Sequence, residues 1–294
     1  MLRARGRGPA AALAFLAAWC LASIPQPAAA FESTPFGDSP HDHITSEAAR
    51  PLGWEGRGLD GLQQAVRAPD VAESKVKGSL GRLVIVDAQG DYEPSHHCDR
   101  LPPVTDQQVF AATSTYIRLE LEEALQLARS QHPERAVGAL GRALHALQDC
   151  HSHSDIVDQG PGVQAAFQDA LLQGGPMPEG LHFTGFQPGE KEADMPPGDG
   201  YPHGLHARDG EHSTPDAEGL LPDGRTRFEA AFHMAANTSR MLLEGFLAQV
   251  NGTVRAQILD VPPQHLNRSP IPSPGALPLL AVLLVGTLAL RRRA

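Results

Sequence analysis

The sequence predicts a mostly α-helical protein built around a single folded domain. Three long segments, 105–129, 134–152 and 225–250, place apolar residues at the spacing of one helix face. Only Leu83–Val86 has the composition of a strand, and one short strand forms no sheet. The 245 residues of the middle part, 31–275, are enough for one well-buried core.

Residues 1–30 have the pattern of a secretory signal peptide. Three Arg precede an apolar run from Ala10 to Ile24, and Ala28-Ala29-Ala30 offers a cleavage site of small residues. A membrane-spanning helix is the weaker alternative, because the run is short and ends in Pro25-Gln26-Pro27. We therefore expect an exported protein whose mature chain begins at Phe31.

The helical domain is expected to cover residues 31–252. Thr105 is a suitable N-cap for the first long helix, Thr105–Arg129. The second, Glu134–Ser152, and the third, Arg225–Val250, each carry an apolar stripe. Shorter helices are expected at Thr45–Arg50, Leu59–Val66 and Gly162–Leu172. The segment Gly174–Asp223 is rich in Gly, Pro and His, so we expect a long irregular loop region there.

The C-terminal end predicts a linker and a membrane anchor. Residues 253–275 are expected to form a Pro-rich linker, and an apolar run in 276–294 ends in Arg291-Arg292-Arg293. The run is short for a span, but flanking Arg side chains can reach the interface. This tail resembles the bacterial C-terminal sorting tails of the PEP-CTERM type. The resemblance implies a protein held at the cell envelope or surface, with a sorting protease as a partner.

The charge balance limits the partners. The whole chain has 24 basic and 34 acidic residues, and the six Arg of its two ends leave the middle with 18 bases against 34 acids, a net charge of −16. Such a surface does not favour the phosphate backbone of nucleic acid. We therefore expect no nucleic-acid partner.

The most informative side chains are histidines on the second long helix. The chain has 14 His, and His145, Asp149 and His153 recur at intervals of four, along one side of a helix. His145 and His153 are roughly 12 Å apart along the axis, so they do not easily share one metal ion, whereas Asp149 can bridge two. The same spacing also fits a solvated helix face. His151 points to another face of the helix, so it is not counted among the candidate metal ligands.

Further clusters strengthen the interpretation as a metal site, because imidazole and carboxylate are the usual ligands of zinc. These clusters are His41-Asp42-His43, Asp70, His96-His97-Cys98-Asp99, the stretch with His203, His206 and Asp209, and His233 with Asn237 one turn later.

These motifs in this order resemble the zinc-dependent phospholipase C and single-strand nuclease superfamily, most closely its Het-C-like and CinY-like branches. The motifs are His41-x2-Ile44-Thr45, Ala68-Pro69-Asp70, His97-Cys98-Asp99 and Leu144-His145-x3-Asp149-x3-His153-Ser154. The resemblance implies an all-α domain of the zinc-dependent phospholipase C type, with up to three zinc ions that hydrolyse phosphate esters.

The resemblance also implies ligands for each zinc ion. The first is expected at Asp70, His97, His145 and Asp149. The second is expected at His41, at Asp149 as a bridge, and at the amino and carbonyl groups of Phe31 once processing has freed them. The third is expected at His153 with His233, or with His203 and Asp209 as alternatives and His206 as a weaker candidate. Asn237 stands where the enzymes carry a carboxylate, and an amide is a poor zinc ligand.

Two more residue roles depend on this resemblance. Asp99, next to His97, is the candidate catalytic base. Cys98 and Cys150 follow two ligands expected at one zinc ion, so the site implies a Cys98–Cys150 disulfide, with two buried free thiols as the alternative.

Three functions stay open from the sequence. The first is a zinc-dependent phosphoric diester hydrolase that acts on phospholipid or another small phosphodiester. The second is a non-catalytic, zinc-stabilised surface protein. The third, a single-strand nuclease, is disfavoured because the middle has no basic cluster and the chain has only 3 Tyr and 2 Trp to stack on bases.

Overall fold

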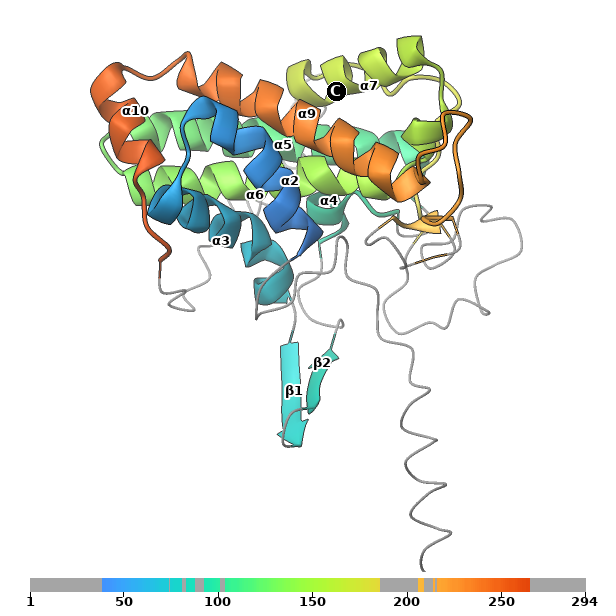
Figure 1. Cartoon of the computed structure of the whole chain (residues 1–294), viewed down its shortest axis with the longest axis horizontal. Helices are drawn as coiled ribbons and strands as arrows, with labels where there is room; N and C mark the ends of the chain where they lie inside the picture. The colour runs from blue at the N-terminus through green and yellow to red at the C-terminus, as the bar shows by residue number, and fades with distance from the viewer. Residues whose placement is uncertain are drawn as a thin grey trace, which may run out of the picture. The chain divides into compact units, whose positions relative to one another are not determined.

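Helices form most of the computed structural model of the chain, which describes residues 39–73, 75–80, 83–87, 93–100, 104–185, 206–208, 214 and 216–264. In chain order the elements are α2 (Pro40–Ala49), the 3-10 turn η1 (Arg50–Leu52), α3 (Gly56–Glu73), β1 (Lys75–Leu80), β2 (Leu83–Asp87), α4 (Pro94–His97), α5 (Asp106–Arg129), α6 (Pro133–Ser152), the 3-10 turn η2 (Asp155–Asp158), α7 (Pro161–Gln173), α9 (Arg227–Leu247) and α10 (Gly252–Leu259) (Figure 1). The mostly helical class predicted from the sequence is confirmed.

Helix α6 is the centre of the core. Its sequence combines Ala, Gly and Leu on the faces that meet other helices, and Leu140, Leu144 and Leu147 are fully buried. It packs against α5, α3 and α9, and α2 lies alongside α9 (Figure 1). A helix enclosed in this way can place polar side chains out of contact with bulk water.

Side-chain caps fix where the principal helices begin. Thr105 accepts from the backbone N–H of Gln108 and forms a capping box, as its predicted N-cap role requires. Ser39 forms the same motif with Asp42, and Pro40 fits the first turn. Because of this cap, α2 begins five residues before the predicted start at Thr45, and His41 becomes helical.

Two details of the predicted architecture were wrong. The strand at Leu83–Asp87 has a partner, since it pairs antiparallel with Lys75–Leu80 in a two-stranded sheet. The folded domain also continues past residue 252. Asn251 caps helix α10, whose Val254 and Ile258 are buried in the core. The first residues of the predicted Pro-rich linker, 253–275, therefore belong to the folded domain.

The predicted signal peptide and C-terminal anchor lie outside the described residues. In the ranges that the structure does describe, no helix has the length and apolar character needed to cross a bilayer.

The contact between α6 and α3 requires a glycine. A Cβ atom built on Gly141 would lie 2.5 Å from the carbonyl carbon and 2.5 Å from the Cβ of Ala65 on α3. Gly138, one turn earlier on α6, meets nothing nearer than the end of Arg142 at 3.9 Å. We expect Gly141→Ala to lower the free energy of unfolding by roughly 1–3 kcal/mol through overpacking. The control Gly138→Ala is expected to raise it by about 0.5–1 kcal/mol. Urea denaturation checks both, and equal effects would show that the helices can move apart at no cost.

Candidate metal centre

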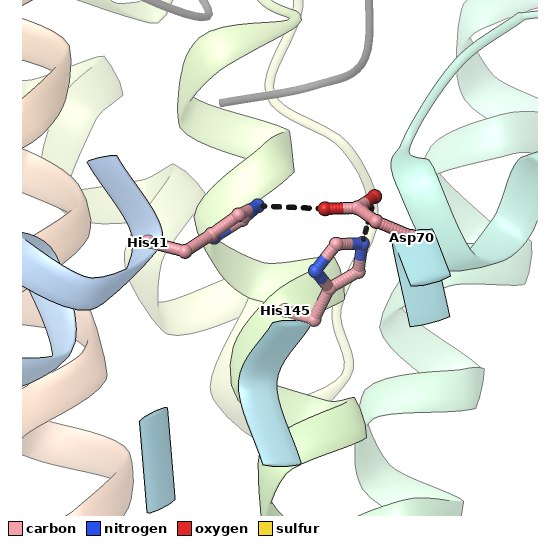
Figure 2. A group of neighbouring side chains, drawn as sticks. All are labelled: His41, Asp70 and His145. Atoms are coloured by element: carbon pink, nitrogen blue, oxygen red, sulfur yellow. Dashed lines mark ion pairs between the residues drawn. The ribbon is translucent and has the colours of Figure 1, made fainter. Parts of the chain in front are cut away.

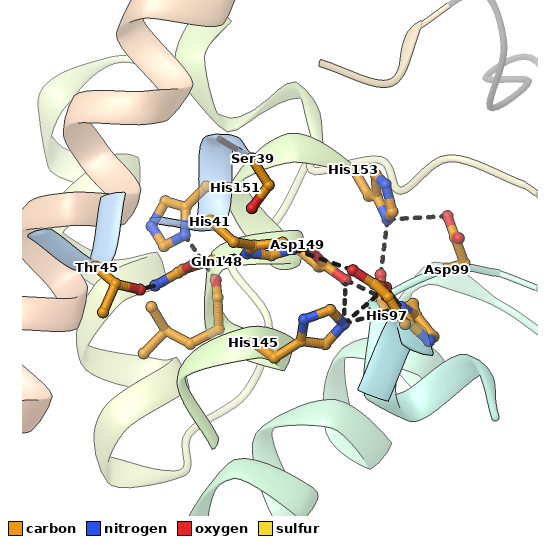
Figure 3. Close-up of polar contacts among 12 residues, drawn as sticks. Ser39, His41, Thr45, His97, Asp99, His145, Gln148, Asp149, His151 and His153 are labelled. Atoms are coloured by element: carbon orange, nitrogen blue, oxygen red, sulfur yellow. Dashed lines mark hydrogen bonds and ion pairs between the residues drawn. The ribbon is translucent and has the colours of Figure 1, made fainter. Parts of the chain in front are cut away.

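Five side chains from four helices meet beside the middle of α6. They are His41 of α2, Asp70 of α3 (Figure 2), His97 of α4, and His145 and Asp149 of α6 (Figure 3). His41, His145 and Asp149 are fully buried, and Asp70 and His97 are 6% and 4% exposed. Buried carboxylates and imidazoles in this number need a compensating charge. These groups could bind a metal ion.

Three donor atoms of the cluster have the spacing of three corners of a tetrahedral zinc site, and an oxygen of Asp70 lies beside them. Nδ1 of His97, Nε2 of His145 and Oδ2 of Asp149 lie 3.1–3.2 Å from one another. Oδ1 of Asp70 lies 3.7 Å from the His97 nitrogen and 3.4 Å from the His145 nitrogen. Zinc bonds to N and O are about 2.0–2.1 Å long, so the edges of such a tetrahedron are about 3.3–3.4 Å. The donor set therefore fits a metal ion of this size.

Both carboxylates also face His41 with their second oxygen. Oδ1 of Asp149 lies 3.2 Å from Nε2 of His41, and Oδ2 of Asp70 lies 3.9 Å from the same nitrogen. Figure 2 shows Asp70 between His41 and His145, with one ion pair to each ring. These two oxygens are buried and face the same ring nitrogen of His41. Asp149 and Asp70 can thus each bridge two metal positions, whereas the sequence analysis predicted a bridging role for Asp149 alone.

The charges of the cluster are strongly coupled. Burial alone raises the pKa of Asp149, but the charge and hydrogen bond of His145, with hydrogen bonds from His41 and His97, outweigh burial and hold this pKa well below its ordinary range. Burial alone lowers the pKa of His41, whereas Asp149, Asp70 and Gln148 outweigh it and raise the pKa. The site therefore favours negative carboxylates that face positive charge.

Local backbone structure brings His97 to the cluster. The short helix α4 ends at His97, and Cys98 follows with φ 55°, in the left-handed region that non-glycine residues rarely adopt. Cys98 is bonded to Cys150 of α6, which confirms the predicted disulfide. One cysteine of this disulfide directly follows His97 and the other directly follows Asp149. The bond therefore holds the chain segments of these two residues next to each other.

A second buried polar group lies at the C-terminal end of α6. The Nδ1–H of His153 donates to the carbonyl of His97 at 2.7 Å and lies 3.2 Å from Oδ1 of Asp99 (Figure 3). Thr184 donates its hydroxyl to the same Asp99 oxygen at 2.7 Å and its backbone N–H to the carbonyl of His153. Asp99 thus contacts both His153 and Thr184. Its expected role as the catalytic base stays a prediction.

Thr184 stabilises this arrangement. We expect Thr184→Val to lower the free energy of unfolding by about 1–3 kcal/mol, because the buried Asp99 oxygen loses a hydrogen-bond donor. The exposed Thr115→Val, on α5, serves as a control and should be close to neutral. Denaturant titration of both variants measures the difference, and a neutral Thr184→Val would contradict the assigned role.

The other residues singled out in the sequence have different positions. His233 is on the exposed side of α9 and pairs with Glu47 at 3.2 Å, and Asn237 is exposed on the same helix. The structure therefore does not bring His233 to the buried side chain of His153. Phe31, His203 and Asp209 lie outside the described residues, and His206 is half-buried.

His151, which the sequence left out, is buried on the α9 side of α6. It donates from Nδ1 to the carbonyl of Leu147, and its Nε2 faces the hydroxyl of Thr238 at 3.1 Å. Burial lowers the pKa of His151 to about 4, so its ring is neutral near pH 7.

Sequence reasoning missed Gln148 and Thr184. The amide of Gln148 contacts the candidate ligand His41, and the hydroxyl of Thr184 contacts Asp99. Neutral amide and hydroxyl groups are too common in sequences to predict a metal site. The only available sign was the position of Gln148 directly before Asp149.

In comparisons with known proteins, no protein-family model, curated protein or solved structure matches the chain.

Proposed function

We propose that this protein is an exported zinc-dependent phosphoric diester hydrolase that acts on phospholipid or another small phosphodiester. The proposal depends on one observation, the close spacing of the donor atoms of His97, His145 and Asp149, with Asp70 near both imidazole nitrogens. A set of nitrogen and oxygen donors without sulfur suits a zinc ion that takes part in hydrolysis.

The residues of the chain have distinct roles in this proposal. Asp149 and Asp70 bind with both oxygens, and His97 and His145 complete the first position. His41 defines a neighbouring position on the far side of the two carboxylates. Zinc bound there supplies Lewis-acid chemistry, since it neutralises a phosphate ester and draws electron density from it. Asp99 and Thr184 keep His153 oriented beside this group, where it is the proposed ligand of a third ion.

The charge of the chain supports the substrate class. A middle part with a net charge of −16 repels a long polyanion more than a small or zwitterionic phosphodiester. The proposed anchor at 276–294 would hold the domain next to lipid head groups. Phospholipid therefore ranks above nucleic acid among the proposed substrates.

A second candidate function is a non-catalytic, metal-stabilised surface protein. The burial of the cluster favours it, because each of the five side chains is at most 6% exposed. In that case the metal serves the stability of the fold, and the ligands need no path for a substrate.

Metal analysis combined with hydrolysis assays distinguishes the candidates. The protein is purified from an exporting host, so that processing has taken place, and is assayed on a chromogenic phosphodiester, phosphatidylcholine vesicles and single-stranded DNA. The proposal expects two to three zinc ions per chain, turnover of the first two substrates, and its loss in His145→Ala. His132→Ala, an exposed His at the start of the same helix, is the control. Zinc without turnover supports the second candidate, and less than one metal ion per chain contradicts both.

A further inference from the structure

Gln148 connects three helices through a fully buried amide. It lies on α6 directly before Asp149, and its side chain is inaccessible to solvent. Its Oε1 lies 2.7 Å from Nδ1 of His41 on α2. Its Nε2 lies 3.3 Å from the hydroxyl of Thr45 on α2 (Figure 3). The same nitrogen lies 3.3 Å from the hydroxyl of Ser239 on α9.

The two ends of this amide have opposite hydrogen-bonding character. Oε1 only accepts hydrogen bonds and Nε2 only donates them. With Nε2 donating to the hydroxyls of Thr45 and Ser239, Oε1 accepts the Nδ1–H of His41. The orientation of the amide and the tautomer of the ring follow together from this network.

This orientation determines what His41 presents to the cluster. A proton on Nδ1 leaves the lone pair of the neutral ring on Nε2, which faces Oδ1 of Asp149 at 3.2 Å and Oδ2 of Asp70 at 3.9 Å. In the reverse orientation Nδ1 would accept from the amide, and the proton on Nε2 would occupy the place of a metal ion.

We propose that Gln148 is a positioning residue that holds the His41 ring in its metal-binding orientation and tautomer, and so sets the affinity of the metal position between His41 and the two carboxylates. The proposal rests on the proposed metal binding and deepens it, because it assigns a role to a residue that is not itself a ligand. Loss of such a partner typically costs 10–100-fold in metal affinity.

The effect is confined to one metal position. The hydrogen bonds of Gln148 go to His41, Thr45 and Ser239, and none of them goes to His97, His145 or Asp149, the donors of the other position. A variant that folds less well would bind zinc more weakly at all positions. A variant that only loses the positioning of His41 would bind zinc more weakly at the His41 position alone.

Stepwise zinc affinities test the proposal. They are measured by competition with a chromogenic chelator for the wild-type chain and three variants. Gln148→Met removes the acceptor at similar volume, and Gln148→Glu restores an acceptor at the same place. Gln168→Met removes a half-buried amide of α7 that donates to Thr238 on α9, and it is the matched control.

Gln148→Met is expected to weaken one zinc-binding step by about 10–100-fold and to leave another within about threefold of wild type. Gln148→Glu should restore the weakened step, and Gln168→Met should change none. Unchanged affinities in Gln148→Met, or equal weakening of every step with a lower melting temperature of the metal-free protein, would overturn the positioning role. A wild-type chain that binds no zinc would instead refute the proposed function, and the two failures are thereby distinguishable.

Discussion

Replacing Asp149 by Asn is expected to empty both metal positions at once. Asp149 presents one oxygen to His97 and His145 and the other to His41, so both positions lose a charged ligand. Removing one partner of a buried charge pair costs roughly 3–5 kcal/mol. At 1.4 kcal/mol per factor of ten, this is about two to three and a half orders of magnitude in metal affinity.

Metal content after dialysis against a fixed zinc concentration measures this effect. Asp169→Asn, an exposed carboxylate on α7, is the matched control and should retain the wild-type content. Circular dichroism of each variant establishes that the helices are present. If Asp149→Asn keeps the same number of zinc ions with unchanged affinity, Asp149 is not a bridge.

Removing the metal is expected to lower the melting temperature strongly. The donor atoms come from α2, α3, α4 and α6, so ions bound at the two positions together connect four helices and bind the folded chain only. A ligand present at a thousand times its dissociation constant raises the free energy of unfolding by about 4.1 kcal/mol for one site. For a domain of this size, 1 kcal/mol corresponds to roughly 2–4 °C, so a chelator should lower the melting temperature by about 8–16 °C.

Differential scanning calorimetry with and without chelator makes this measurement. Added zinc should restore the transition, and magnesium, which prefers an octahedral set of oxygen ligands, should not. The Asp149→Asn variant is expected to be insensitive to chelator, since it starts without metal. A wild-type melting curve that is the same in chelator and in zinc would contradict a metal-stabilised fold.

The long helices and two of the five cluster residues could be predicted from local signals alone. The apolar period located α5, α6 and α9, and the four-residue interval between His145 and Asp149 placed both on one side of α6. Thr105 was recognisable as an N-cap from its own turn. Each of these inferences needs only the geometry of a single helix.

The parts that were missed depend on contacts between distant segments. Helix α4 has four residues, too few to show a period, and β1 becomes visible as a strand only through its pairing with β2. The amide of Gln148 gains its role from His41, more than a hundred residues away in sequence. His233 and Asn237 have ligand spacing, but the period of α9 directs its buried face to Ala235, Leu242 and Phe246, and leaves these two residues exposed.

The most direct test of the metal centre is anomalous diffraction at the zinc edge from crystals grown with zinc. The proposed metal centre predicts one peak within bonding distance of His97 Nδ1, His145 Nε2, Asp70 and Asp149, and a second peak between His41 Nε2 and the other oxygen of Asp149. Zinc-loaded crystals with no peak at these five side chains would contradict it.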